Sequence, residues 1–208
     1  MQPSRDLLIF PCNGNGLEAL DCLTPDLRFI GFVDDTPAKQ QAGMMGFAVL
    51  AREALVQHAQ AQVLAVPGSP TSYKERLRII ASLGIDPARF ATLIHPSAQV
   101  SPRARIGRNV LVMAGAVITS NAVIGDHVCV LPNSVIHHDT VIGEGSLIGS
   151  NVTIAGSVKV GRQCYIGSGT SIMNGLEIGD GALLGLGTNV IRSVTPGSRV
   201  VGNPARPL

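Results

Sequence analysis

The dominant pattern in this sequence is an aliphatic residue at every sixth position, which begins at Ile94 and continues without interruption to Val190. These positions define seventeen consecutive hexads, and the residue four places after each of them is small or of moderate size. Glycine directly follows the aliphatic residue in eight of the hexads. A period of six fits neither a helix nor an alternating strand. It fits a solenoid whose triangular coil contains three short strands and three turns.

Each hexad position has an expected place in such a coil. The aliphatic residue points into the prism, the small residue packs beside it, and Gly and Asn take corners where φ can be positive. Strands of stacked coils pair in parallel, so that each coil buries the face of the next. The hexads therefore predict a solenoid of five to six coils.

Residues 1–92 carry a different pattern, in which short apolar runs alternate with amphipathic segments. Alternation of this kind predicts a small parallel α/β sheet. We therefore divide the chain into an α/β domain at 1–92 and a solenoid domain at 93–208. The expected elements are strands at Asp6–Pro11, Arg28–Val33 and Gln62–Val66, and helices that begin at Gly14, lie near Ala51–His58 and span Ser72–Leu83.

A G-x-G-x-x-A pattern at 14–19 falls between the first expected strand and the helix after it. Asp34 follows twenty residues after Gly14, at the end of the second strand, as a nucleotide-binding turn requires. Only about half of a full dinucleotide-binding fold fits into 92 residues. The pattern therefore favours a ligand of mononucleotide size.

Three properties of the sequence reduce the number of possible functions: its net charge, the length of its apolar runs and the spacing of its cysteines. The net charge is +2 and there is no basic run, which argues against nucleic-acid binding. The apolar stretches are too short for a membrane span, so we expect no membrane insertion. The four cysteines show no CxxC spacing, and we expect reduced thiols and a cytoplasmic location.

A small α/β domain, the link Leu93–Ala98, an insertion-free solenoid and the tail Val201–Arg206 follow one another along this chain. In this order they resemble the sugar O-/N-acetyltransferase family of the left-handed parallel β-helix (hexapeptide-repeat) acyltransferases. That family includes the sialic-acid O-acetyltransferases and the N-acetyltransferases of nucleotide-linked 4-amino sugars of the bacillosamine and perosamine type. The resemblance implies acetyl-CoA as cosubstrate, a nucleotide-linked sugar as substrate, and a role in surface polysaccharide (lipopolysaccharide) biosynthesis. It also implies a homotrimer with active sites between subunits.

The densest polar cluster of the solenoid is His137-His138-Asp139. Acetyl transfer to an amine needs a base for the amine proton, and a carboxylate beside an imidazole raises its basicity. The resemblance assigns the base to His138 and the modulating acid to Asp139, with His137 as a neighbour that shapes the pocket. It assigns the amide that stabilises the oxyanion to Gly156, where an ordinary corner glycine is the competing interpretation.

The resemblance also implies two sets of binding residues. The residues expected along acetyl-CoA are Leu147, Ser168 and Leu186. The residues expected at the nucleotide-linked sugar are Gly14, Asn15, Gly16, Asp34, Asp35 and Gly68. Relatives often carry a glycine where this chain has Pro11, which leaves the nucleotide open, and the two aspartates before Thr36-Pro37 also fit a simple turn.

The sequence leaves other functions open. Acetylation of a sugar hydroxyl would use the same His138–Asp139 pair. A metalloenzyme of the γ-carbonic-anhydrase type would need three zinc-binding histidines, for which His127, His137 and His138 are candidates with unsuitable spacing, so we expect no metal. A non-catalytic scaffold that binds a nucleotide is the third alternative.

Overall fold

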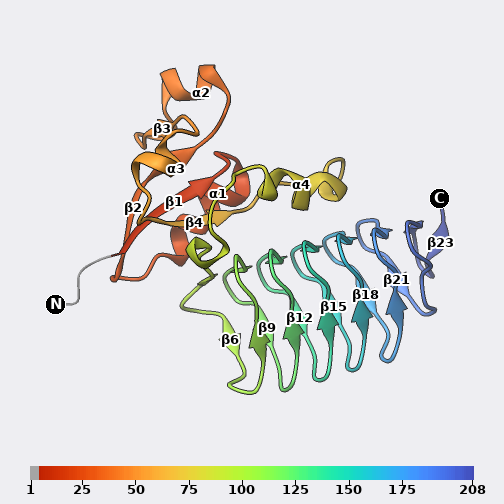
Figure 1. The fold of residues 1–208 in the computed structure, drawn as a ribbon. Helices are drawn as coiled ribbons and strands as arrows, with labels where there is room; N and C mark the ends of the chain where they lie inside the picture. The colour runs from red at the N-terminus through yellow and green to blue at the C-terminus, as the bar shows by residue number, and fades with distance from the viewer. Residues whose placement is uncertain (1–4) are drawn as a thin grey trace.

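The computed structural model describes residues 5–208, which form an α/β domain at one end of a long parallel β-helix (Figure 1). Within this range the domain contains a parallel sheet with the strand order β3-β2-β1-β4. The strands are β1 (Arg5–Phe10), β2 (Leu27–Val33), β3 (Val49–Leu50) and β4 (Gln62–Ala65). Leu7, Leu8 and Ile9 are fully buried, because both faces of β1 are covered, as in parallel sheets generally.

Short helices connect these strands, and they differ from the prediction at α2, over Ser72–Leu83 and at η3, for which no helix was expected. The prediction missed α2, because Thr36-Pro37 was interpreted as a turn, although proline also fits the first position of a helix. The single helix expected over Ser72–Leu83 is divided into η2 and α4. The helical segments are α1 (Gly14–Glu18), η1 (Ala19–Cys22), α2 (Pro37–Ala42), α3 (Ala54–Gln57), η2 (Tyr73–Glu75), α4 (Arg76–Ala81) and η3 (Pro87–Arg89).

The β-helix has three faces, which we number in chain order. The first face comprises β5 (Leu93–Ile94), β8 (Leu111–Val112), β11 (Cys129–Val130), β14 (Leu147–Ile148), β17 (Tyr165–Ile166) and β20 (Leu183–Leu184), then β22 (Arg199–Val201) and the antiparallel β23 (Arg206–Pro207). The second face comprises β6 (Gln99–Val100), β9 (Val117–Ile118), β12 (Val135–Ile136), β15 (Thr153–Ile154), β18 (Ser171–Ile172) and β21 (Asn189–Val190). The third comprises β7 (Arg105–Ile106), β10 (Val123–Ile124), β13 (Val141–Ile142), β16 (Lys159–Val160) and β19 (Glu177–Ile178).

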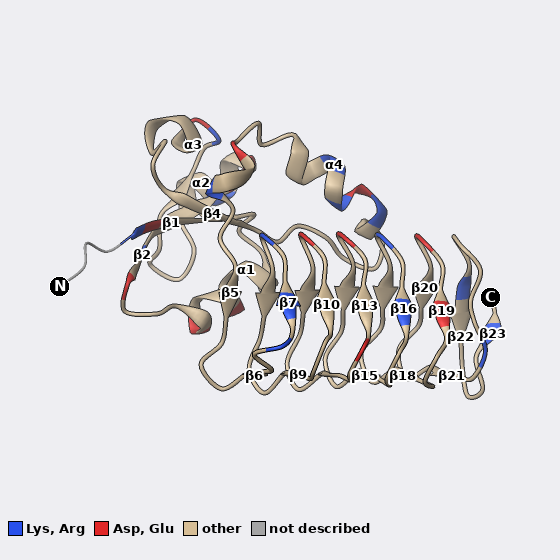
Figure 2. Ribbon diagram, turned by 60° about the horizontal axis from the view of Figure 1, so that its bottom comes forward, with Lys and Arg blue, Asp and Glu red and all other residues tan. Residues whose placement is uncertain are grey.

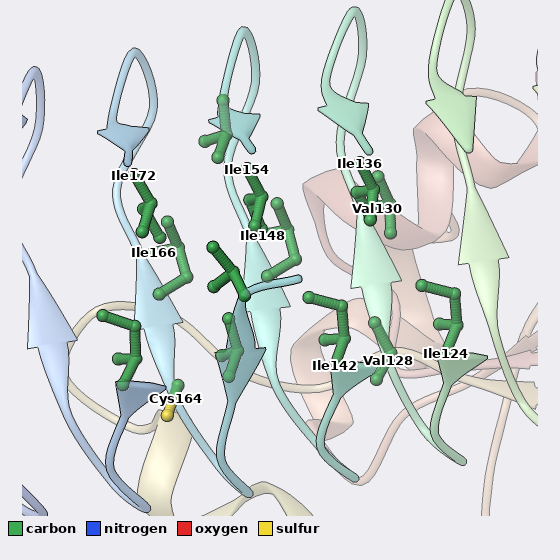
Figure 3. Close-up of a cluster of buried hydrophobic side chains, with 14 of the residues drawn as sticks. Ile124, Val128, Val130, Ile136, Ile142, Ile148, Ile154, Cys164, Ile166 and Ile172 are labelled. Atoms are coloured by element: carbon green, nitrogen blue, oxygen red, sulfur yellow. The ribbon is translucent and has the colours of Figure 1, made fainter. Parts of the chain in front are cut away.

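The hexad pattern of the sequence is confirmed by the packing inside the prism. Residues eighteen positions apart pair in register, as Val130 does with Ile148, so that each aliphatic residue stacks on its counterpart in the next coil. These side chains point inward from all three faces (Figure 3). The small residues four places later, such as Ser146 and Cys164, are also fully buried. Each fully buried Ile or Val contributes about 1.5–3 kcal/mol to folding.

The corners use two kinds of position, and only one of them has positive φ. Every sixth residue from Asn109 to Gly187 has a positive φ, and these positions hold Asn and Gly as predicted, together with His127, Asp139, Ser157 and Gln163. The glycines that directly follow the aliphatic residues serve another purpose. A Cβ on Gly143 would lie 2.4 Å from the backbone carbon of Gly161, so these glycines allow close approach of neighbouring coils.

The α/β domain covers the apolar outer side of the first face. Leu111, Cys129, Leu147 and Leu183 share one buried cluster with residues of β1, β2 and η1. On the rest of the surface, basic and acidic residues are interspersed along the solenoid (Figure 2). None of the helices described within residues 5–208 has the length and apolar character needed to cross a bilayer.

Candidate active site

His138 and Asp139 lie at the corner between the second and third faces and form a hydrogen-bonded pair. The His138 Nδ1 atom is 2.8 Å from Asp139 Oδ2, and both side chains are more than half exposed. Because an ionised carboxylate only accepts hydrogen bonds, Nδ1 is the protonated nitrogen of the neutral ring. In this tautomer Nε2 carries the lone pair and is the ring atom that can accept a proton.

Asn121, which the sequence analysis did not single out, completes this cluster from the preceding coil. Its Nδ2 donates to Asp139 Oδ1 at 3.1 Å. The hydrogen bonds from His138 and Asn121 hold the pKa of the Asp139 carboxyl below its usual value. The signal for Asn121 was available, since a residue eighteen positions before Asp139 occupies the same corner one coil earlier.

Gly156 lies at the same corner in the following coil, directly against the imidazole. A Cβ at this position would lie 2.6 Å from both Cε1 and Nε2 of His138. Gly156 is the only glycine at this hexad position in the sequence, where other coils carry Ala114, Ser120 or Asp180. The backbone therefore does not require glycine here, and the requirement comes from the His138 ring. Gly156 is buried, and within residues 5–208 its N–H donates no hydrogen bond to another group of the chain.

The other histidines lie elsewhere or lack partners for a metal site. His137 is partly exposed beside His138, whereas His127 lies on the corner between the third and first faces. There the His127 ring bonds to Asn109 at 2.9 Å. Within the described chain, no group of three or more His, Cys, Asp or Glu side chains is arranged to hold a metal ion.

The glycine turn after β1 is tightly packed. Asn13 caps α1 by accepting from the Gly16 N–H at 2.8 Å. Gly16 is buried, and a Cβ there would lie 2.6 Å from the Pro11 carbonyl oxygen. Gly14 is exposed and Asn15 partly so. Of the three residues predicted at this turn, Gly14 and Asn15 are therefore the accessible ones.

Both aspartates that follow β2 already have partners inside the chain. The Asp34 carboxylate is buried and accepts from the Cys12 N–H at 3.1 Å, the Thr36 N–H at 3.0 Å and Lys39 Nζ at 2.8 Å. Burial raises the pKa of Asp34, but the bonds from Lys39 and Thr36 outweigh it and lower the pKa overall. The partner of Asp35 is Arg52. Asp34 thus closes a short Asx turn with Thr36, and the residues after it begin α2 instead of the simple turn expected at Thr36-Pro37.

A cavity of about 210 Å³ lies between the α/β domain and the first face. It brings together Asn15 and Gly68, predicted for the sugar nucleotide, and Leu147, predicted for acetyl-CoA. The remaining lining residues are Ser69, Pro70, Leu131, Ile148, Gly149 and Tyr165. The floor of the cavity is apolar, and the Asn15 amide and Ser69 hydroxyl lie among its lining groups.

The predicted site residues occupy two different edges of the prism. Ser168 and the exposed Leu186 lie on the corner between the first and second faces, next to the face that carries Leu147. His138 lies on the corner between the second and third faces. One chain therefore does not bring His138 to the cavity or to the predicted acetyl-CoA residues.

Comparison with known proteins gives a family match and a fold match. The family model described as "Bacterial transferase hexapeptide (six repeats)" matches residues 121–156, which include the His138 corner. A comparison with curated proteins finds no match.

Several solved structures match almost the whole chain. The acetyltransferase domain of PglB from Neisseria gonorrhoeae, in complex with acetyl coenzyme A, is 27% identical with a TM-score of 0.85, and the match covers 99% of this chain and 100% of that one. PerB from Caulobacter crescentus, in complex with CoA and GDP-perosamine, is 25% identical with a TM-score of 0.82, at 99% and 97% coverage. WeeI from Acinetobacter baumannii, 23% identical with a TM-score of 0.83, shares the fold at 99% and 100% coverage. The resemblance of this chain to the hexapeptide-repeat sugar acetyltransferases is thereby confirmed.

Proposed function

We propose that this protein is an acetyl-CoA-dependent N-acetyltransferase that acts on the amine of a nucleotide-linked amino-deoxy sugar. The observation that carries the proposal is the cluster at one corner, where Asn121, Asp139 and His138 form a hydrogen-bonded chain against Gly156. The structural relatives crystallised with acetyl-CoA, or with CoA and GDP-perosamine, support both substrates.

The chemistry follows from the protonation state of this cluster. His138 Nε2 accepts the proton of the sugar amine while the amine nitrogen attacks the thioester carbonyl. Asp139 stabilises the imidazolium through the Nδ1–H bond. The Gly156 N–H donates to the oxyanion of the tetrahedral intermediate. When the C–S bond breaks, His138 returns the proton to the thiolate of CoA, which leaves as the thiol.

Substrate binding is assigned to the cavity at the first face. Asn15, Gly68 and Ser69 contact the sugar nucleotide there, and Leu147, Ser168 and Leu186 line the path of acetyl-CoA. Since the cavity and His138 lie on different edges of the prism, a complete site needs two copies of the chain. The proposal therefore includes a homotrimer with active sites between subunits.

The cellular setting is part of the same proposal. We place the enzyme in the cytoplasm, where thiols are kept reduced, in the biosynthesis of a surface polysaccharide. All four cysteines are free and buried. Asp34 and Asp35 contribute by fixing the turn and α2, because their carboxylates are engaged within the chain.

A direct assay tests the reaction. Thiol release from acetyl-CoA is measured against UDP-, GDP- and dTDP-linked 4-amino-4,6-dideoxy sugars. One of these sugars should be turned over, and His138→Ala should lower kcat about 10²- to 10⁴-fold, the usual contribution of a general base. His58→Ala is the matched control, because His58 is exposed at the end of α3. Turnover only of sugars with a free hydroxyl acceptor would instead establish an O-acetyltransferase.

Mixed oligomers test the shared site. Ser69→Trp should block the cavity, and His138→Ala should remove the base, so that each variant alone is inactive. When the two are co-assembled, about a quarter of the sites combine an intact cavity with an intact His138 from the neighbouring subunit. Recovery of activity near that fraction supports the shared site. No recovery from verified mixed oligomers contradicts it.

A further inference from the structure

The segment from β4 to α4 lies along the corner between the third and first faces, where α4 runs over the coils (Figure 1). Five positive-φ corner residues, spaced eighteen apart, contact this segment in five successive coils. The contacts join Asn109 to Ala65, His127 to Arg76, Gly145 to Leu77, Gln163 to Lys74, and Gly181 to Tyr73. We call this column of five corner residues the docking ridge.

Asn109 binds the outer edge of the N-terminal sheet at β4, where the sheet meets the solenoid. Its Oδ1 accepts from the Ala65 N–H at 2.7 Å, and its Nδ2 donates to the Ala65 carbonyl at 2.8 Å. The side-chain amide thus makes the two bonds that a further strand would make beside β4. Asn109 is fully buried, so these bonds are shielded from water.

The second Nδ2 hydrogen of Asn109 points at His127 Nδ1, at 2.9 Å. Because Ala65 fixes the orientation of the amide from both sides, Nδ1 of His127 is the acceptor and the ring is neutral. The charged groups around this ring are Arg76 on α4 and Asp126 and Glu144 on the solenoid. The ring of Phe90 packs edge-on against it at a centroid distance of 5.1 Å.

Arg76 holds the other end of the segment. Its side chain is fully buried, and its guanidinium donates to the His127 carbonyl at 2.8 and 3.1 Å and to the Pro67 carbonyl. A buried arginine bonded only to backbone carbonyls is costly to desolvate, so its position is under strong constraint. Arg76 therefore links Pro67, at the start of the loop, to the same corner of the solenoid that binds Ala65.

The loop between these anchors lines the cavity. Gly68, Ser69 and Pro70 lie between Ala65 and Arg76 in the sequence and contribute to the cavity wall. Gly68 adopts φ +119, and a Cβ there would lie 3.1 Å from Leu147. The position of this loop relative to the first face therefore depends on bonds made at a different edge of the prism.

We propose that Asn109, His127 and Arg76 are positioning residues that set the loop 66–72 in place for the acceptor substrate. The inference rests on the proposed function for the identity of that substrate, but the geometry of the loop is independent of it. Removing the amide of Asn109 releases Ala65 and the loop, while the His138 corner, which lies at another edge, keeps its structure.

Amide hydrogen exchange and kinetics on the full-length protein test this. Asn109→Gly keeps the positive φ and removes the amide; Asn133→Gly is the control, an exposed positive-φ asparagine outside the docking ridge. In Asn109→Gly we expect exchange at residues 66–72 to be roughly tenfold faster and KM for the sugar nucleotide to rise about five- to tenfold. We expect kcat, and KM for acetyl-CoA, to stay within about twofold.

A conservative rescue separates positioning from general stability. His127→Gly should reproduce the Asn109→Gly effect, whereas His127→Asn, whose Oδ1 replaces the Nδ1 acceptor, should restore protection and KM. Unchanged exchange at residues 66–72 in Asn109→Gly, or equal loss of protection across residues 5–92, would overturn the proposal. If the wild type turns over no nucleotide sugar but the exchange pattern holds, the proposed function fails and the positioning of the loop stands.

Discussion

At the scale of single residues, the most informative position is Gly156, where glycine leaves room for the His138 ring. Gly156 differs from its equivalents in all other coils, and the three atoms nearest to a Cβ at this position all belong to the His138 ring. The His138 ring of one coil thus needs the space that the absence of a Cβ at Gly156 leaves in the next coil. The oxyanion role of Gly156 stays a prediction beside the interpretation as an ordinary corner glycine, and the contact with His138 supports the first of these.

Gly156→Ala should therefore disturb the catalytic corner selectively. The added Cβ displaces the His138 ring from its bond with Asp139, and we expect kcat to fall about 10²-fold or more. The melting temperature should change little, because alanine occupies the same hexad position at Ala114 without difficulty. Steady-state kinetics and thermal unfolding measure both effects. Retention of full activity would show that the ring does not act from this position.

Asn121 provides a second prediction at this scale. Asn121→Gly preserves the positive φ but removes the bond to Asp139 Oδ1. Asp139 then rotates more freely and orients His138 less well, so we expect kcat to fall about tenfold with KM nearly unchanged. Asn133→Gly again serves as the matched control. A similar fall of kcat in both variants would show that the change at the corner backbone, and not the lost bond to Asp139, causes the effect.

At the scale of elements, the sequence predicted the spacing and the inward positions of the solenoid strands, because each strand is set by a local pattern that repeats every six positions. The α/β elements were predicted less well for the opposite reason. Whether Thr36-Pro37 is a turn or the start of α2 depends on Lys39 reaching Asp34, and the break between η2 and α4 accompanies docking on the ridge. Neither a side-chain contact over five residues nor a contact between the two domains leaves a periodic signal in the sequence.

The two kinds of corner glycine lead to opposite predictions for stability. In Gly143→Ala, the Cβ meets the backbone of Gly161 at 2.4 Å, where nothing can move aside, and we expect a loss of about 3 kcal/mol or more. In Gly187→Asn, the positive φ suits asparagine and no atom lies within 4 Å, so stability should stay within about 0.5 kcal/mol. Chemical denaturation compares the two. Equal losses of unfolding free energy in the two variants would contradict the distinction between glycines that allow close approach of coils and glycines that adopt a positive φ.

At the scale of the whole molecule, the candidate site was only half predictable. Asn15, Gly68 and Leu147 were identified separately and do meet in one cavity. Because corners repeat every eighteen residues, the sequence pattern already puts His138 on a different edge from Ser168 and Leu186, but it does not show where the cavity lies relative to that edge. Nor did it reveal that a column of corner residues binds the α/β domain. These features depend on how two domains with different repeats are docked, and the docking is fixed by buried polar groups such as Arg76.

The pH dependence of stability follows from this docking. Burial lowers the pKa of His127, helped by Arg76, and outweighs the opposing effects of Glu144 and Asp126. Between the usual histidine pKa of about 6.5 and the lower pKa of the folded state, the unfolded chain binds more protons than the folded one. Stability is therefore fully present above about pH 6.5 and declines as the pH falls through this window. His127→Asn keeps an acceptor for Asn109 but does not titrate, so its unfolding free energy should fall less steeply between pH 7 and 5. Parallel pH profiles for the two proteins, measured by denaturant unfolding, would show that His127 is not the titrating group that links the two domains.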